Sequence, residues 1–319
     1  MNIVILGSGA LGTVLGAHLA KAGEEVTLLA RGNRAAYLQE HGATIMGLVD
    51  FTVPITVVTD PRQIQEADVL IVTVKTYDME SALASVKHMQ VGSVLSIQNG
   101  VVKNEQLADV FGWEKVLGAM AWVSGEMLPT GTIRFTANNG LYLGEFPKGL
   151  SERVQRLADT VERAGIMVKV TPAIQSIEWS KYVMFACTMA PAVLTRLESH
   201  KFLQDEQTAS VVASLFHEMA QIATAKGIAL EDLPLFLIKT FSGLSFEDTV
   251  AQFRHIGDQL ASQAPNHKVS TLQDAEQGKR LEVEEILGYA VRQGATLGVP
   301  MPTMATCYKL IAGMNRYFQ

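Results

Sequence analysis

The chain has 319 residues and a mass of 34.6 kDa, enough for two ordinary domains. Hydrophobic residues make up 48% and charged residues 18%, the balance of a globular protein, and no repeat or low-complexity tract indicates a solenoid or a disordered chain. The net charge of −6 and the scattered basic residues argue against a nucleic-acid partner. No apolar run is long enough to span a membrane, and residues 1–6 lack the features of a signal peptide. We therefore expect a soluble, cytoplasmic protein without a membrane partner.

The cysteines and histidines do not form a metal-binding pattern. Cys187 and Cys307 stand alone, without a CxxC spacing, so we expect both to be buried small apolar residues. His217 and Glu218 begin an HE pair, but the second histidine of a zinc-binding HExxH motif is missing. We predict that the protein binds no metal.

Residues 2–170 alternate short β-branched runs with helical segments, the pattern of a parallel sheet covered by helices. Residues 150–165 carry apolar side chains at helical spacing and predict an amphipathic helix. We predict an α/β fold with a Rossmann-type, doubly wound parallel sheet in residues 1–170. The predicted strands are 2–6, 25–30, 67–74, 92–97 and 115–123, then an antiparallel-looking pair at 132–135 and 141–145, and a last strand at 166–171.

The segment GSGALG, residues 7–12, follows the first strand and opens a helix, which is the context that a GxGxxG fingerprint requires. Its first glycine permits a tight turn, its second lets the backbone approach a pyrophosphate, and its third allows close packing of helix on sheet. The helix N-terminus adds free N–H groups. We predict that a dinucleotide is bound by Gly7, Ser8, Gly9, Ala10, Leu11 and Gly12, whereas the alternative is a turn that merely contains small residues.

The residue after the second strand predicts which dinucleotide is bound. The strand ends at Ala30, where a fold that binds NAD places an acidic residue on the ribose hydroxyl. Here the residue is Arg31, whose guanidinium can pair with a 2′-phosphate and stack on adenine. NADP(H) is therefore the predicted cofactor. Arg34 lies nearby, and the sequence leaves open whether it contacts ligand or is a solvated surface charge.

Polar residues also follow two later strands of the predicted sheet. Lys75 and Thr76 end one run, and Gln98, Asn99 and Gly100 end the next. Ligands bind at the carboxyl ends of parallel strands, so these residues are candidates for the same crevice, with Lys75 as a cofactor contact. Taken alone, a lysine at a strand end is commonly solvated and an Asn-Gly pair is commonly a turn.

Beyond Pro172, long helical patterns dominate, so we place a domain boundary after residue 170 and predict an all-α catalytic and dimerisation domain at 171–319. Residues 178–192, EWSKYVMFACTMAPA, contain a single cation, Lys181. The main predicted helices are 208–226, 269–297 and 301–314, with stop signals at Gly227, Gly298 and Pro300.

The order of these motifs resembles the ketopantoate reductase (2-dehydropantoate 2-reductase) family over nearly the whole chain. The resemblance rests on GSGALG, VKT, QNG and WSK, followed by SxxxDxxxGKRLEVEEILG, which begins at Ser270. It implies a two-domain fold similar to that of 6-phosphogluconate dehydrogenase. It also implies the NADPH-dependent reduction of 2-dehydropantoate to (R)-pantoate, for pantothenate and coenzyme A synthesis.

The resemblance also implies roles for single residues. Lys181 corresponds to the proton donor, Glu282 to a partner of cofactor and substrate, Asn99 to a contact of both nicotinamide and substrate, and Ser270 to a substrate contact. Independently, hydride delivery to a ketone builds alkoxide charge that a positioned ammonium can stabilise and protonate. From the residues alone, Lys181 could instead snorkel to the surface, and Ser270 with Gln273 matches a helix capping box.

The chain departs from the family's pattern beside Lys181. Family members carry asparagines four and eight residues after this lysine, and here those positions hold Phe185 and Met189. Residues at this spacing share one helix stripe, so we expect an apolar wall at the substrate.

We therefore expect an NADPH-dependent 2-oxo acid reductase with 2-dehydropantoate as its first candidate substrate. One alternative is a D-2-hydroxyacid dehydrogenase or reductase for a more apolar, branched 2-oxo acid. A second is an NADP(H)-binding regulatory protein that has lost catalysis. A homodimer is expected only because dimers are the commonest oligomers.

Overall fold

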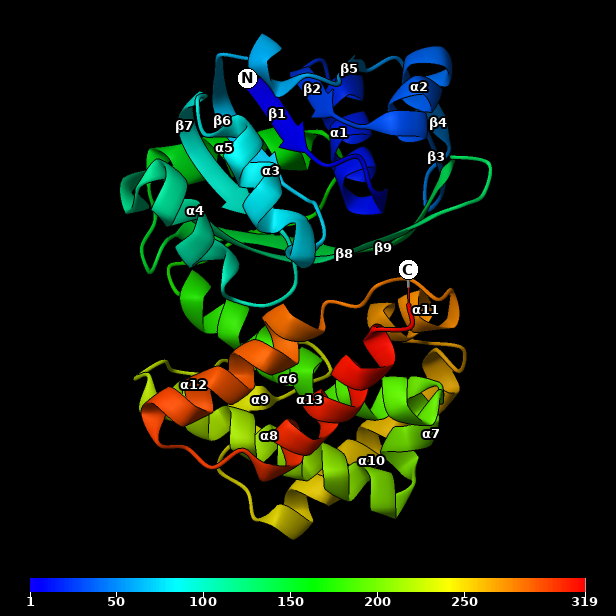
Figure 1. Ribbon diagram of the computed structural model, residues 1–319, viewed down its shortest axis with the longest axis vertical. Coiled ribbons are helices and arrows are strands. Elements are labelled where there is room, and N and C mark those ends of the chain that lie inside the picture. The colour runs from blue at the N-terminus through cyan, green and yellow to red at the C-terminus, as the bar shows by residue number, and fades with distance from the viewer. Residues whose placement is uncertain (319) are drawn as a thin grey trace. The chain divides into compact units, whose positions relative to one another are not determined.

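The chain folds into two compact units in a computed structural model that describes residues 1–318 (Figure 1). The first unit comprises Met1–Gln98 and Val102–Gln175, and the second comprises Asn99–Val101 and the chain from Ser176 onward. The expected boundary after residue 170 coincides with the end of strand β10 (Val168–Val170), whereas the units divide five residues later, between 175 and 176. The extra residues belong to the first unit because Ile174 packs there: a Cβ added to Gly118 would lie 2.6 Å from it.

The first unit contains a parallel sheet with the strand order β5-β2-β1-β6-β7. Its central strand alternates two buried faces, with Ile3 and Ile5 in one hydrophobic cluster and Val4 and Leu6 in the other. Burial on both faces explains why this strand is apolar at every position after its first residue. The strands of this sheet are β1 (Asn2–Leu6), β2 (Glu25–Leu29), β5 (Thr56–Val58), β6 (Glu66–Val72) and β7 (Gln90–Ser96).

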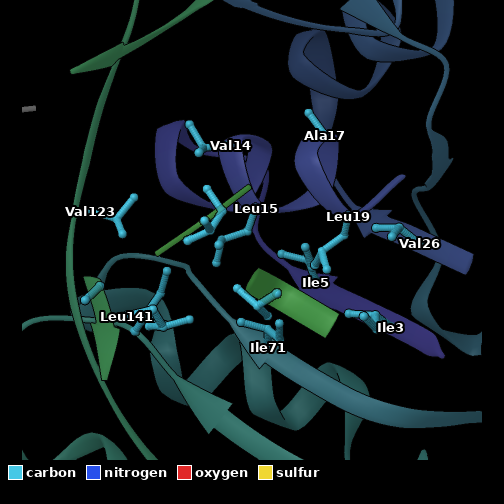
Figure 2. Packing of buried hydrophobic residues seen from close by; sticks show 14 of the residues in the cluster. Ile3, Ile5, Val14, Leu15, Ala17, Leu19, Val26, Ile71, Val123 and Leu141 are labelled. Atoms are coloured by element: carbon cyan, nitrogen blue, oxygen red, sulfur yellow. The ribbon is translucent and has the colours of Figure 1, made fainter. Parts of the chain in front are cut away.

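Helices cover both faces of this sheet, as predicted. Helix α1 places Leu15 and Leu19 against Ile3 and Ile5 (Figure 2), and α3 and α4 bury their apolar residues in the cluster on the opposite face. The doubly wound arrangement is therefore confirmed. The helices of this unit are α1 (Ala10–Lys21), α2 (Gly32–His41), α3 (Met79–Val86), α4 (Lys103–Phe111) and α5 (Glu152–Arg163), and its short 3₁₀ turns are η1 (Pro61–Gln63), η2 (Thr76–Asp78) and η3 (Trp113–Lys115).

A second, mixed sheet differs from the expected strand assignment. Residues 115–123 were predicted to extend the parallel sheet. Val116 does form a single parallel bridge with Val94 of β7, but the chain from Leu117 onward belongs to β8, which pairs antiparallel with β9. The expected pair at 132–135 and 141–145 is the single strand β9, and three short strands between 43 and 58 were not predicted. The remaining strands are β3 (Ala43–Gly47), β4 (Phe51–Val53), β8 (Leu117–Met127) and β9 (Ile133–Glu145), with β10 completing the order β10-β9-β3-β4.

The second unit contains helices and no strand among its described residues, as predicted. The helix expected at 269–297 is not continuous. Its two ends are helical, as α11 and as a π-helix that leads into α12, but the chain turns between them at Gly278, with φ +67°. A left-handed residue ends a helix, and the apolar periodicity resumes beyond it. The helices are α6 (Ile174–Thr195), α7 (Ser199–Gln204), α8 (Glu206–Ala225), α9 (Ile238–Phe241), α10 (Phe246–Gln263), α11 (Ser270–Glu276), the π-helix η4 (Glu284–Gly288), α12 (Tyr289–Leu297) and α13 (Pro302–Asn315).

The structure also locates the two cysteines and the His-Glu pair that were considered in the sequence. Cys187 and Cys307 are both buried free thiols, as predicted. Glu218 accepts hydrogen bonds from the backbone N–H groups of Thr303 and Met304, so it caps the start of α13. Within residues 1–318, no helix is long and apolar enough to cross a membrane, and no group of three acidic, histidine or cysteine side chains is placed to hold a metal ion.

Candidate active site

The glycine-rich segment forms the tight loop between β1 and α1. Gly7 has φ +116°, and a Cβ added to it would lie 2.8 Å from Oγ1 of Thr73. A Cβ on Gly12 would overlap the Gly7 carbonyl oxygen. Gly9, in contrast, is exposed and has no atom within 4 Å of the place where its Cβ would lie. Two glycines are thus required by the protein's own packing, and the middle one leaves an open approach to the backbone.

The N-terminus of α1 is free to bind an anion. Gly9 precedes the helix and provides no side-chain cap, and no acidic residue lies in the first turn. The first N–H groups of a helix have no intrahelical partner, and the helix dipole gives them a partial positive charge. Together with the open face at Gly9, this loop fits the pyrophosphate of a dinucleotide. Ser8, Ala10 and Leu11 are partly exposed along it.

Arg34 holds this loop in place. From α2, its Nε donates to the Ser8 carbonyl oxygen at 3.1 Å, one terminal nitrogen donates to the Thr13 hydroxyl at 3.0 Å, and the other donates to the Gly131 carbonyl oxygen at 2.6 Å. The guanidinium also lies over the Tyr37 ring, 5.3 Å from its centroid. Burial lowers the pKa of Arg34, although an arginine in a protein stays charged. Arg34 is therefore not a solvated surface charge, because the protein itself engages this guanidinium.

Arg31 differs from Arg34 in its surroundings. It immediately precedes α2, has extended backbone angles and is exposed. Its backbone carbonyl accepts a hydrogen bond from the Ala35 N–H group, but its side chain makes no hydrogen bond or ion pair with any of residues 1–318. Of the two guanidiniums that follow β2, Arg31 is therefore the one that is available to a ligand.

The ends of β6 and β7 are joined by hydrogen bonds. The Gln98 side-chain amide donates to the Val74 carbonyl oxygen at 2.6 Å, and the Ser96 hydroxyl donates to the Gln98 side-chain oxygen at 3.0 Å. Lys75, the predicted cofactor contact, precedes η2 and is half-buried, as is Asn99 at the end of β7. The segments that follow β6 and β7 are therefore joined by a hydrogen bond from the Gln98 side chain to the main chain at Val74.

Lys103 is a buried cation that the sequence reading missed. It is the first residue of α4 and is only 2% exposed. Its ammonium donates to the carbonyl oxygens of Gln98 and Ala119, at 3.1 Å and 2.6 Å. A buried charge at the N-terminus of a helix is unfavourable both for its desolvation and for the helix dipole. Its hydrogen bonds to two carbonyls offset part of that cost and hold the backbone just before Asn99.

Helix α6 carries the predicted catalytic lysine on an apolar background. Lys181 is half-buried, and it is the only cation of the helix. Phe185 is 7% exposed, whereas Met189 exposes none of its surface. The apolar stripe expected beside Lys181 is therefore present. Contact with a substrate is compatible with the exposure of Phe185, but full burial argues against the direct contact predicted for Met189.

The segment that contains Glu282 and Ser270 is built differently from the prediction. Ser270 is exposed at the start of α11, and Val269 is the capping position, with no side-chain cap hydrogen bond, so the capping box is wrong. Gln273 instead donates from its side chain to the Lys268 carbonyl oxygen at 3.0 Å. Glu282 lies beyond the turn at Gly278, just before the π-helix, and is only 5% exposed. Ser270 and Glu282 therefore do not share one helix.

Comparison with known proteins shows to which family the chain belongs. Residues 3–148 match the family described as ketopantoate reductase PanE/ApbA, and residues 173–315 match its second part, described as ketopantoate reductase PanE/ApbA C terminal. The chain is a member of the ketopantoate reductase family.

Relatives with this family's name match over nearly their whole length. The 2-dehydropantoate 2-reductase of Pyrococcus abyssi is 27% identical over 314 residues, which cover 98% of this chain and 97% of the relative. The crystal structure of the PanE/ApbA family ketopantoate reductase from Ralstonia eutropha JMP134 is also 27% identical, with a TM-score of 0.85 over 99% of each chain. A structure of D-mandelate dehydrogenase with NADH and anilino(oxo)acetate has a TM-score of 0.84 at 18% identity, covering 99% of this chain and 98% of that one. At this identity, the last likeness shows the fold alone.

The sequence motifs of this ketopantoate reductase family member contain the residues that are expected to bind a ligand, but they do not show which residues hold the motifs in place. Arg34, Lys103 and Tyr182 each bind a backbone carbonyl beside or within a motif. Their contacts join residues that are distant in the sequence or lie in different elements. The only available sequence signal was a charged or polar residue close to a motif, and such residues are usually solvated.

Proposed function

We propose that this protein reduces a 2-oxo acid to the (R)-2-hydroxy acid with NADPH, and that the substrate is 2-dehydropantoate, the product (R)-pantoate. The observation that carries this proposal is Lys181, a half-buried ammonium and the only cation of α6, in the position of the family's WxK motif. Family membership supports the reaction class. In this role the protein would supply pantoate for pantothenate and coenzyme A synthesis.

The preference for NADPH rests on Arg31. Its exposed guanidinium at the end of β2 suits a 2′-phosphate, since two parallel N–H groups can bind two phosphate oxygens. The glycine loop and the uncapped start of α1 would hold the pyrophosphate, with Lys75 and Asn99 as further contacts. When bound, the nicotinamide would supply the hydride. Arg34 would act only through the loop that it holds.

The remaining chemistry belongs to the protein's own residues. An ammonium beside the keto oxygen stabilises the charge that develops there and then transfers a proton to it, which together contribute about 10²- to 10⁴-fold in rate. Lys181 would take this role from α6, where it is half-buried among mostly buried side chains. Glu282, a buried carboxylate in the same unit, would balance the charge of this ammonium and orient the substrate. Ser270, exposed at the start of α11, would contact the substrate's polar groups.

A second candidate is the reduction of a more apolar, branched 2-oxo acid, as by a D-2-hydroxyacid dehydrogenase. Phe185 favours it, because this buried ring replaces a family asparagine one turn from Lys181. A site without that amide would not select for the hydroxyl group of 2-dehydropantoate. The two candidates differ in substrate and not in catalytic residues.

The experiment follows NADPH oxidation by absorbance with 2-dehydropantoate and with a panel of branched and aromatic 2-oxo acids. Lys181→Ala should lower kcat by about 10²- to 10⁴-fold and leave the Kd for NADPH unchanged. Lys201→Ala is the matched control, because Lys201 is an exposed cation of the same unit that pairs with Glu198. Wild-type turnover by Lys181→Ala would overturn the catalytic assignment.

The same measurements separate the alternatives. Tight NADPH binding without oxidation of any substrate would favour a regulatory protein over an enzyme. Preference for an apolar 2-oxo acid would favour the second candidate, and stronger binding of NADH than of NADPH would contradict the role of Arg31. The homodimer stays a prediction, which sedimentation velocity can test.

A further inference from the structure

A π-helix begins two residues after Glu282. Residues Glu284–Gly288 form this turn before the chain continues as α12. Single π turns are rare and are frequently found at functional sites. A local feature of this kind needs contacts that hold it, and here two of them converge on Ile286.

The first contact comes from the residue after Lys181. The hydroxyl of Tyr182 donates to the Ile286 carbonyl oxygen at 2.6 Å, across 104 positions in the sequence. Tyr182 is 1% exposed, and its burial raises its pKa well above the usual value, so the hydroxyl keeps its proton. It is therefore a permanent donor to the middle of the π-helix, one residue from the proposed proton donor.

The second contact is made by the Ile286 side chain. A Cβ added to Gly100 would lie 2.9 Å from Cδ1 of Ile286, and Gly100 has φ +82°. Both residues belong to the second unit, together with Asn99. The turn that carries Asn99 thus packs through its glycine against the residue that Tyr182 holds.

We propose that Tyr182 is a positioning residue that fixes the π-helix, and with it Glu282 and the Asn99-Gly100 turn, relative to Lys181. The inference rests on the proposed function for its catalytic consequence. Its structural core is independent of the substrate: a single hydroxyl beside Lys181 holds the backbone of Ile286, and Ile286 in turn packs on Gly100. Three proposed site residues from distant parts of the sequence are then arranged by one hydrogen bond.

The test is Tyr182→Phe, which removes only the hydroxyl. Tyr308→Phe is the matched control, since the Tyr308 hydroxyl donates to the side chain of Glu284, on the exposed side of the same π-helix. For Tyr182→Phe we expect kcat to fall roughly tenfold, the loss that one buried hydrogen bond brings, while the Kd for NADPH changes much less, because most of the proposed cofactor contacts lie in the first unit. Hydrogen exchange should become faster at the amides of both Glu284–Gly288 and Asn99–Val101. Tyr308→Phe should leave these quantities at wild-type values.

Several outcomes would overturn the inference. One is wild-type kcat in Tyr182→Phe. Another is faster exchange across the whole second unit, which would mean that the hydroxyl supports only general stability. If the wild-type protein reduces no 2-oxo acid, the proposed function fails, but exchange still decides the inference: faster exchange in both segments supports it, and unchanged exchange at Asn99–Val101 contradicts it.

Discussion

The glycine loop of the first unit and the π-helix of the second unit both depend on close contacts with the backbone, but they are specified in different ways. In the loop, Gly7 and Gly12 exclude side chains from one tight turn, and the residues that need each other are five positions apart. In the π-helix, Tyr182 and Ile286 need each other across 104 positions. Two residues at a short spacing form a motif that can be recognised in a single sequence. Tyr182 and Ile286 are too far apart to form such a motif, so nothing in the sequence marks them as a pair.

Within the first unit, the glycine loop also depends on contacts that are distant in the sequence. The glycine loop has a local pattern, but the contacts that support it are distant. Arg34 joins the loop to Gly131 in the β8–β9 turn, and His18, on α1, donates a 2.8 Å hydrogen bond from Nδ1 to the Ala164 carbonyl oxygen. The local motif thus identifies the backbone that is proposed to face the ligand, while the contacts that hold this backbone come from the rest of the unit.

The largest effect is expected when the two kinds of glycine in the loop are compared. Gly12→Ala forces a Cβ onto the Gly7 carbonyl oxygen, so the backbone must shift, and we expect a loss of about 1–3 kcal/mol in the free energy of unfolding together with loss of NADPH binding. Gly9→Ala meets no atom of the protein and has a compatible φ of −67°, so stability should stay at the wild-type value. Its affinity for NADPH should still fall about tenfold or more, if the pyrophosphate approaches this open face. Urea unfolding and fluorescence titration measure both quantities, and wild-type affinity in Gly9→Ala would refute the placement of the cofactor.

The next largest effect is expected at Lys103, which makes one hydrogen bond to a residue nearby in the sequence and one to a distant residue. Lys103→Met removes an ammonium that donates to Gln98 nearby and to Ala119 in β8, and it leaves two carbonyls without this donor. We expect the free energy of unfolding to fall by about 2 kcal/mol. Lys87→Met, at an exposed position of the same unit, should change it by less than about 0.5 kcal/mol. Equal stabilities of the two variants in urea would show that the buried bonds contribute nothing.

A smaller effect separates the two arginines that follow β2. Arg31→Ala should weaken NADPH binding by about tenfold and NADH binding much less, because only NADPH carries the 2′-phosphate. Arg34→Lys should weaken both cofactors alike, since a lysine cannot reproduce three hydrogen bonds in one plane and the loop itself is then disturbed. Isothermal titration with both cofactors measures this. A selective loss of NADPH affinity in Arg34→Lys would place this residue at the phosphate and break the distinction.

The same distinction explains what the sequence alone could predict of the fold and site. Residues 2–6 with GSGALG, and residues 150–165, contain their own pattern and were assigned correctly in type. Strand β8 was assigned to the wrong sheet, because a buried apolar run has the same composition in a parallel and in a mixed sheet. The short strands β3 to β5 are partly exposed and lack an apolar run. The break at Gly278 was missed because helical periodicity continues on both sides of it, and the roles of Lys103 and Tyr182 depend on tertiary partners.

The smallest expected effect concerns His18, which tests whether α1 depends on distant packing. His18 lies between Phe51 and Phe135, and its Nε2 is buried without a hydrogen-bond partner among the described residues. Burial lowers its pKa below the usual 6.5, and the nearby Lys21 lowers it further, against the hydrogen bond to Ala164. The folded protein therefore keeps His18 neutral at a pH where the unfolded chain already protonates it. The contribution of His18 to stability is complete above pH 6.5 and is lost as the pH falls below 6.5 towards the lower pKa of the folded state.

Urea unfolding between about pH 7 and pH 5 should therefore show a decline in the free energy of unfolding that is smaller in His18→Gln. The difference cannot exceed about 1.4 kcal/mol per pH unit, the limit for one proton. Burial also lowers the pKa of His217, but its contribution is the same in both proteins, so the difference between their slopes isolates His18. Identical slopes would mean that the imidazole is hydrated in the folded state, and that α1 and its glycine loop are held by the parallel sheet alone. A steeper dependence of the free energy of unfolding on pH in the wild-type protein would show that α1 is also held by β4, β9 and the end of α5. These contacts cannot be predicted from the GxGxxG motif.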